Sequence, residues 1–340
     1  VCFYILPTFA YTVDITTLGA KGDGITDNTA FIQKAIDDCS ARKGGTVEIP
    51  SGHFLTRTLF LKSNVNLHLH FGAELLGSTD LDSYHKVFPE LKGKESPALI
   101  FARGVANIAI TGSGTINGQG AHQNFQHGND SKGGPRRPKI IYFIGCNNVR
   151  VQDVTLRNSA YWTQDYEKCN GVIVRGVKVY SHANWNNDGL DIDSRNVVVS
   201  DCYIDCDDDA LCLKSDTDTP CENVTVTNCV LKSNCNAIKF GTSSYSGFKN
   251  VTISNCTIDR ASEDHIRQWY KNYPWIGTKH KTVVAGIALE SVDGGIIENV
   301  SISDIAMQGV QTPIFVRLGD RKRTFSKQMS RINDVMISRI

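Results

Sequence analysis

Three aspartates lie in two short motifs that could supply acid–base chemistry. Asp188 belongs to NNDGLDID, and Asp208 and Asp209 belong to DDDALCLK. Both motifs lead into an alternation of apolar and polar residues, the pattern of a half-buried strand. Aligned by this alternation, Asp188, Asp209 and Asn236 occupy equivalent positions, with Asp208 beside them. Since like charges repel, such crowding suits chemistry in which one carboxyl group holds a proton and another does not.

A motif of the form Asn-hydrophobic-x-hydrophobic determines the architecture that must position these residues. It begins at positions 64, 107, 148, 170, 196, 223, 250, 299 and 333, and from 148 to 250 the steps are 22, 26, 27 and 27 residues. A second short strand precedes most of these motifs, beginning at positions 189, 210, 237, 286 and 313. This repeat predicts an all-β fold, a single-stranded right-handed parallel β-helix. Each repeated Asn is expected in a left-handed turn, hydrogen-bonded to its neighbour one coil away. An antiparallel sandwich would give no reason for a 27-residue repeat.

The two ends of the chain differ from the repeats. The segment DNTAFIQKAIDDCSARKGG predicts an amphipathic helix with Thr26 or Asp27 as N-cap and Gly44 at its end. Such a helix would cover the open end of the solenoid. Residues 1–10, VCFYILPTFA, are typical of the end of a signal peptide, with an apolar first strand as the alternative. We therefore expect one β-helix domain over residues 11–340, truncated within a repeat at its C-terminus.

Composition excludes several classes of function. The 36 Lys and Arg residues and 35 Asp and Glu residues leave a net charge of +1, which argues against nucleic acid as a partner. No run of eighteen apolar residues exists, so no membrane-spanning helix is predicted. We expect a monomer that is secreted or periplasmic.

Eleven cysteines are an odd number for an exported protein. Three of them, spaced by 27 residues, predict a buried stacked column: Cys202, Cys229 and Cys256. Two further pairs, Cys206–Cys212 and Cys221–Cys235, are left as candidate disulfides. No CxxC motif occurs, so zinc or redox chemistry is only weakly indicated and no metal site is predicted.

The motifs resemble those of the polygalacturonase family, glycoside hydrolase family 28. The likeness rests on NNDGLDID, CDDDALCLKS, the opening GAKGDGITDNTAFIQKAIDDC and LKSNVNLHLHFGAELLGSTD. The family's Asn-Thr-Asp and Asp-Asp motifs match Asn186, Asn187, Asp188, Asp208 and Asp209, with Asn187 in place of Thr. The resemblance implies an inverting, cofactor-independent hydrolase of a pectic polysaccharide or oligosaccharide. Asp208 would be the general acid, and Asp188 and Asp209 would activate water, with acid and base roughly 6.5–9.5 Å apart.

Two departures from the family pattern concern the substrate. The family's Gly-His-Gly motif falls on residues 235–237, so Asn236 replaces its His. Its Arg-Ile-Lys motif, which contacts the uronate carboxylate, falls on residues 288–290 and ends in Glu290. A Glu at this point would repel galacturonate, so we expect a preferred sugar other than plain galacturonic acid, with homogalacturonan hydrolysis as the alternative.

Several cations could replace the lost carboxylate site. Lys239 and Arg317 lie one coil on either side of the 288–290 strand and could form a displaced site, or Lys239 and Glu290 could neutralise each other. Lys214 is expected to contact substrate or to pair with the aspartates.

Two insertions interrupt the repeat. Residues 260–281 contain Trp269 and Trp275, whose rings could stack on sugars or pack the loop on the exterior. Residues 118–139 are interpreted as a solvated, mobile loop.

Five further residues are less informative. His182 is interpreted as structural, and Asp191 and Asp193 as solvated positions in preference to a calcium site. Tyr161 and the adjacent Trp162 fit a subsite or the core equally well.

Two other functions remain open on the same scaffold. A calcium-dependent polysaccharide lyase would hold the metal on the aspartate cluster and use Lys214 or Lys239 as the base. A non-catalytic carbohydrate-binding β-helix is the other, although a binding surface gains nothing from crowded like charges.

Overall fold

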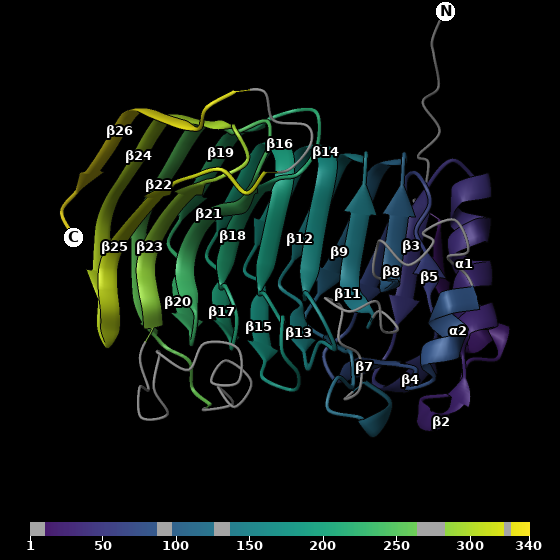
Figure 1. Ribbon diagram of the computed structural model, residues 1–340. Coiled ribbons are helices and arrows are strands. Elements are labelled where there is room, and N and C mark those ends of the chain that lie inside the picture. The colour runs from purple at the N-terminus through teal and green to yellow at the C-terminus, as the bar shows by residue number, and fades with distance from the viewer. Residues whose placement is uncertain (1–10, 87–96, 126–136, 264–282, 323–327) are drawn as a thin grey trace, which may run out of the picture.

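Parallel strands wind into a solenoid that runs the length of the molecule (Figure 1). The computed structural model describes residues 11–86, 97–125, 137–263, 283–322 and 328–340. Within these ranges 26 strands form one continuous sheet, and their pairings are parallel, each strand with its counterpart in the next coil. The predicted β-helix is confirmed.

The strands fall into three ladders, one for each side of the coil. The first contains β5 (Leu59–Phe60), β8 (Ala98–Arg103), β11 (Lys139–Ile144), β14 (Gln164–Arg175), β16 (Leu190–Ser200), β18 (Leu211–Ser215), β21 (Asn236–Ser244), β23 (Val283–Ser291) and β25 (Val310–Leu318). The second contains β1 (Thr12–Asp14), β3 (Gly45–Ile49), β6 (Val65–Leu69), β9 (Ala106–Gly112), β12 (Asn147–Gln152), the later halves of β14 and β16, β19 (Cys221–Thr227), β22 (Phe248–Arg260), β24 (Ile296–Met307) and β26 (Arg331–Ser338).

The third ladder completes each coil. It contains β2 (Asp23–Asp27), β4 (Gly52–Thr56), β7 (Ala73–Gly77), β10 (Thr115–Asn117), β13 (Thr155–Arg157), β15 (Lys178–Ser181), β17 (Tyr203–Cys206), β20 (Val230–Ser233) and the ends of β22 and β24. Inward positions are apolar and stack in register from coil to coil. In the first ladder one such column is Leu190, Leu211, Ile238, Ile287 and Ile314.

The predicted cysteine column is present inside the solenoid. Cys202, Cys229 and Cys256 are buried, and the Cys229 thiol contacts both of the others. All ten cysteines in the described ranges are free thiols, so neither of the two candidate pairs, 206 with 212 or 221 with 235, is a disulfide. Apolar stacking rather than cross-linking therefore stabilises these coils.

An asparagine ladder marks the turn into the second ladder. Asn64, Asn107, Asn148, Asn196, Asn223, Asn250 and Asn299 have positive φ angles between 53° and 65°. Their amides bond from coil to coil at 2.7–3.0 Å, except at the coil of Asn170, where one bond is 3.4 Å. At two repeats the left-handed position is one residue later than predicted: Gly171 takes it in place of Asn170, and Asp334 in place of Asn333, which pairs beside Glu298.

Helix α1 (Thr29–Ala41) covers the N-terminal end of the solenoid, as predicted (Figure 1). Its buried face consists of Ile32, Ala35, Ile36 and Cys39. Asn28 occupies the N-cap position, but Asp27 supplies the capping oxygen, which accepts from the Thr29 amide at 3.0 Å. Shorter helical segments are η1 (Ile15–Leu18), α2 (Leu81–Lys86) and η3 (Gln123–Phe125). None of the helices in the described ranges has the length and apolar character needed to cross a membrane.

Candidate active site

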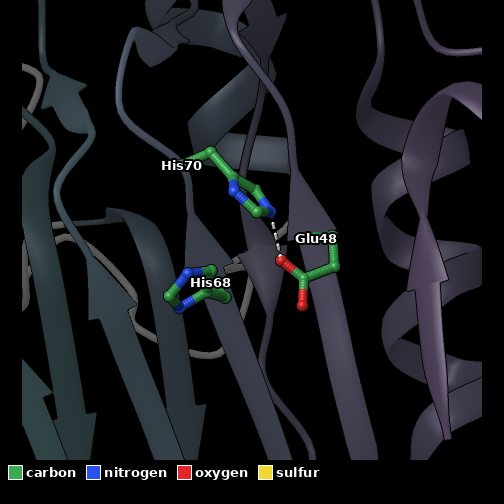
Figure 2. Close-up of side chains that lie close together, drawn as sticks. All are labelled: Glu48, His68 and His70. Atoms are coloured by element: carbon green, nitrogen blue, oxygen red, sulfur yellow. Dashed lines mark hydrogen bonds and ion pairs between the residues drawn. The ribbon is translucent and has the colours of Figure 1, made fainter.

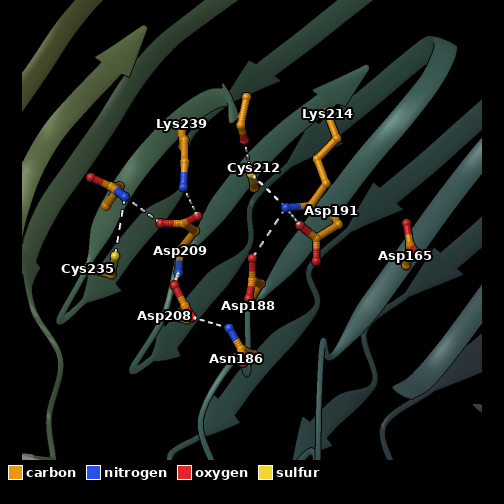
Figure 3. Close-up of polar contacts among 12 residues, drawn as sticks. Asp165, Asn186, Asp188, Asp191, Asp208, Asp209, Cys212, Lys214, Cys235 and Lys239 are labelled. Carbon is orange, nitrogen blue, oxygen red and sulfur yellow. Dashed lines mark hydrogen bonds and ion pairs between the residues drawn. The ribbon is translucent and has the colours of Figure 1, made fainter. Parts of the chain in front are cut away.

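The first ladder brings Asp188, Asp208 and Asp209 together on successive coils (Figure 3). Asp188 directly precedes the Gly189 that enters β16, and the Gly189 amide donates to the Asp209 carbonyl at 2.9 Å. The amide that follows Asp209 donates in turn to the Asn236 carbonyl at 2.9 Å. The predicted column of Asp188, Asp209 and Asn236 therefore exists. All three carboxyl groups are at least 96% buried.

Asp208 is surrounded by groups that fix its position. Its backbone amide donates to Asn187 Oδ1 at 3.0 Å, and Asn186 Nδ2 donates to its Oδ2 at 3.3 Å. The Asp209 amide donates to its Oδ1 at 3.0 Å. Burial, followed by the nearby charges of Asp188 and Asp209, raises the pKa of Asp208 well above its usual value. Asp208 is thus the carboxyl group suited to hold a proton.

Asp209 has the opposite electrostatic environment. Lys239 Nζ donates to its Oδ2 at 2.8 Å, and Asn236 Nδ2 donates to its Oδ1 at 2.6 Å. Burial alone would disfavour the charge, but Lys239 and Lys214 outweigh burial and hold the pKa of Asp209 below its usual value. Asp209 is therefore a stable carboxylate beside a protonated neighbour.

Asp188 lies between these two extremes. Burial raises its pKa to about 6, helped by the Asp209 charge and opposed by Lys214. Its Oδ2 lies 3.6 Å from Lys214 Nζ, and no group in the described ranges donates to its buried Oδ1. A carboxylate oxygen with an unused lone pair is what a general base needs in order to accept a proton from water.

Asp191 and Asp193 contradict the prediction of solvated positions. Asp191 is fully buried and lies 3.0 Å from Lys214 Nζ, and burial raises its pKa well above the usual value. Asp193 is 5% exposed and accepts from the Asp216 amide at 2.9 Å, and burial raises its pKa to about 8. Both face outward by the alternation of β16, but the outer face of the first ladder is itself covered here.

His182 stabilises the turn that carries the Asp-Asp motif by pairing with two carboxylates. Its Nδ1 lies 3.0 Å from Asp207 Oδ1 and its Nε2 lies 3.0 Å from Asp205 Oδ1. Burial would lower the pKa of His182, but the two carboxylates outweigh it and raise the pKa to about 9. A doubly paired imidazolium therefore holds the chain next to Asp208, in agreement with the structural role expected for this His.

Arg137 is a positioning residue that sequence reasoning missed. It is completely buried, and its Nη1 donates to Ala160 O, Asn184 Oδ1 and Trp185 O at 2.7–2.9 Å. Its Nη2 reaches Asn186 Oδ1 at 3.5 Å. This end of the 118–139 insertion is part of the site, so the mobile-loop interpretation is wrong for it. No local pattern around Arg137 marks it in the sequence.

The comparisons with known proteins settle the family. A model described as "Glycosyl hydrolases family 28" matches residues 39–340. This chain belongs to glycosyl hydrolases family 28. The exo-poly-alpha-D-galacturonosidase of Dickeya chrysanthemi is 30% identical over 250 residues, which cover 58% of this chain and 41% of that protein. The chain spans less than half the length of the curated relatives it matches.

Solved structures share the β-helix of this family 28 chain. The family 28 exopolygalacturonase of Yersinia enterocolitica aligns with a TM-score of 0.73 and 23% identity, over 97% of this chain and 66% of that one. PfbA, a surface adhesin of Streptococcus pneumoniae, aligns with a TM-score of 0.66 and 17% identity, over 96% and 79%. The fold alone therefore does not determine the function, which has to be argued from the site.

The cations near this family 28 site form ion pairs with neighbouring carboxyl groups of the chain. Lys239 lies beside Ala288 in register, but its ammonium pairs with Asp209 in the preceding coil. The proposed neutralisation of Lys239 by Glu290 is therefore wrong. Glu290 is 8% exposed and lies 3.6 Å from Arg317, its neighbour in the next coil.

Aromatic rings border the cluster on the side of β14. Tyr161 and Trp162 are stacked with centroids 5.3 Å apart, and both are partly exposed. The ammonium groups of Lys139 and Lys214 lie 4.6 Å and 4.3 Å from the Trp162 centroid. The subsite interpretation of these two rings thus fits their position. Trp269 and Trp275 lie outside the described residues.

Proposed function

We propose that this family 28 chain hydrolyses glycosidic bonds in a pectic-type polysaccharide or oligosaccharide, with inversion at the anomeric carbon. Asp208 acts as the general acid, and Asp188 and Asp209 activate the attacking water. The names of the Dickeya and Yersinia relatives support the substrate class. We further propose a monomer acting outside the cytoplasm, where such polymers occur.

The observation that carries this proposal is the opposite behaviour of two adjacent carboxyl groups. The pKa of Asp208 is raised and the pKa of Asp209 is lowered, although both are buried in one cluster. Titratable groups whose surroundings push their pKa values apart mark the acid and the base of an active site. A purely binding surface has no use for this difference.

The reaction follows from these protonation states. Asp208 donates its proton to the glycosidic oxygen as the bond between that oxygen and the anomeric carbon breaks. A water molecule held by Asp188 and the Asp209 carboxylate attacks the same carbon from the opposite face and loses a proton to Asp188, while Lys239 keeps Asp209 ionised. Asp208 ends ionised and Asp188 protonated, and exchange with solvent restores both.

The charges around the cluster support an altered sugar preference. With Asp208 and Asp191 protonated, the carboxylates of Asp188 and Asp209 balance the ammonium groups of Lys214 and Lys239. No excess positive charge is left there to bind a uronate carboxylate. We therefore propose that the sugar at the cleavage site is not plain galacturonic acid.

A product assay tests the function. The protein is incubated with a panel of pectic and neutral polysaccharides, reducing ends are measured, and the anomer released is identified by NMR. Asp208→Asn is expected to lower turnover by about 10²–10⁴-fold, since general acid catalysis contributes that much. Asp193→Asn is the matched control: it removes the acidic proton of another buried carboxyl group of the same face and is expected to leave turnover unchanged. Full turnover by Asp208→Asn would falsify the proposed acid.

The same assay separates hydrolysis from elimination. A calcium-dependent lyase would release products that absorb in the ultraviolet and would stop with chelator. Lys214 argues against a metal among these aspartates, because its ammonium already lies 3.0 Å from Asp191 and 3.6 Å from Asp188. Ultraviolet-absorbing products that disappear with chelator would replace the hydrolase proposal.

A further inference from the structure

A second group of ionisable side chains lies on the outside of the N-terminal coils (Figure 2). His68 lies in β6 and His70 directly follows the end of that strand; the two are two residues apart and both point outward, while Leu67 and Leu69 point inward. Glu48 on β3 lies directly beside His68 in register. One ligand atom from each of these three side chains lies within 4.8 Å of the others.

Hydrogen bonds fix the tautomer of His68. Thr111 Oγ1 donates its one proton to Asn66 Oδ1 at 2.9 Å, so its contact with His68 Nδ1 at 2.8 Å requires an N–H on that nitrogen. The lone pair of the neutral ring is therefore on Nε2. In metal-binding histidines the N–H of the other ring nitrogen typically donates a hydrogen bond to an oxygen in this way. This bond fixes the orientation of the ring and makes it a better ligand.

The other two ligands already touch one another. His70 Nε2 and Glu48 Oε2 lie 2.5 Å apart and share a proton in a hydrogen bond shorter than the charge-assisted range of about 2.7–2.9 Å. A divalent ion that takes the place of this shared proton would bind both atoms, with the proton released to solvent. The His70 and Glu48 side chains are 51% and 21% exposed, so they can open by the small amount that an ion requires.

We propose that Glu48, His68 and His70 form a binding site for a transition-metal ion, zinc in the first instance. Two imidazoles and one carboxylate are a ligand set that zinc accepts, with water at the remaining position. The site joins two successive coils, β3 and β6, at the end covered by α1. It lies on the second ladder, separated from β16 by the intervening strands β9, β12 and β14. An ion there would stabilise the N-terminal coils without taking part in the hydrolysis.

Titration calorimetry with zinc chloride on the whole protein tests the site. The wild type is expected to bind one zinc ion and to melt at a higher temperature when zinc is present. His68→Ala and His70→Ala are expected to lose both effects. Thr111→Val leaves all three ligands in place but removes the acceptor for His68 Nδ1, so it should weaken zinc binding by about tenfold or more.

The chain contains a matched control for a simple ion pair. His53 Nδ1 lies 2.7 Å from Glu74 Oε2, likewise between successive coils and exposed, but these two residues are not part of the three-residue group. His53→Ala should therefore bind zinc like the wild type. Zinc binding that survives in the double variant His68→Ala/His70→Ala, or that His53→Ala weakens equally, would overturn the proposal. A Thr111→Val protein with unchanged affinity would remove the argument from the His68 tautomer.

Discussion

The first and second ladders are made by the same coils, but their outward-facing residues differ in burial. In the later half of β16 outward residues such as Arg195 and Val198 are exposed. In the earlier half of the same strand Asp191 and Asp193 also face outward, yet both are buried. Alternation thus determines which side chains turn outward, but it does not determine whether that face meets water.

The two ladders also differ in how their charges are balanced. On the covered face each ammonium group has a carboxylate within 3.0 Å: Lys139 with Asp165, Lys214 with Asp191 and Lys239 with Asp209. Burying these ions is costly, and a buried cluster of this kind marks a candidate functional site. On the second ladder pairs such as Lys249 with Glu298 are only half-buried and stabilise the fold little.

Two lysines of one coil allow the sharpest test of this difference. Lys239→Met leaves the Asp209 carboxylate buried without its cation and should lower the free energy of unfolding by about 3–5 kcal/mol. Lys249→Met removes a half-buried pair and should cost about 0–1 kcal/mol. Urea denaturation of both variants measures the difference. Equal losses would show that the two faces do not differ in the way described.

Much of the aspartate cluster could be predicted because a repeat fixes its own register. Because β16 and β18 are equivalent strands in successive coils, the residues that precede them, Asp188 and Asp209, are neighbours. This follows from the repeat alone and needs no information about the rest of the chain. The Asn ladder could be predicted for the same reason. The capping helix followed from its apolar periodicity and its flanking residues.

Other parts of the site depend on contacts that no repeat encodes. Arg137 approaches from the end of an insertion, and the burial of Asp191 depends on what lies over the first ladder. The sequence also does not determine the ion-pair partner of Lys239, because Asp209 and Glu290 lie in the two coils on either side of it. The His68–His70 spacing was visible in the sequence, but the approach of Glu48 required the register of β3 with β6.

The pH dependence of stability tests the covered face directly. The pKa of Asp188 is about 6 in the folded protein against an ordinary value of 3.8. Between these values the folded state retains a proton that the unfolded state loses, so stability falls as pH rises, by up to about 3 kcal/mol. The Asn of Asp188→Asn cannot ionise, so this variant does not lose stability in the same way. Its free energy of unfolding relative to the wild type should therefore rise by up to that amount between pH 4 and pH 6.5. Urea denaturation at both pH values measures the gain, and a constant difference would contradict the burial argument.

The smallest effect is expected on the exposed side, in the asparagine ladder. Asn250 accepts from Asn299 at 2.8 Å and donates to Asn223 at 3.0 Å, and its φ is +54°. Asn250→Gly keeps the left-handed turn and loses only these solvent-exposed bonds, so it should cost about 1 kcal/mol. Asn250→Ala loses the same bonds and adds the left-handed penalty of about 1–2 kcal/mol. The gap between the two variants in thermal or urea unfolding measures the backbone cost separately from the hydrogen bonds. If Gly and Ala are equally destabilising, the ladder is held by its amide bonds and the choice of Asn owes little to the left-handed turn.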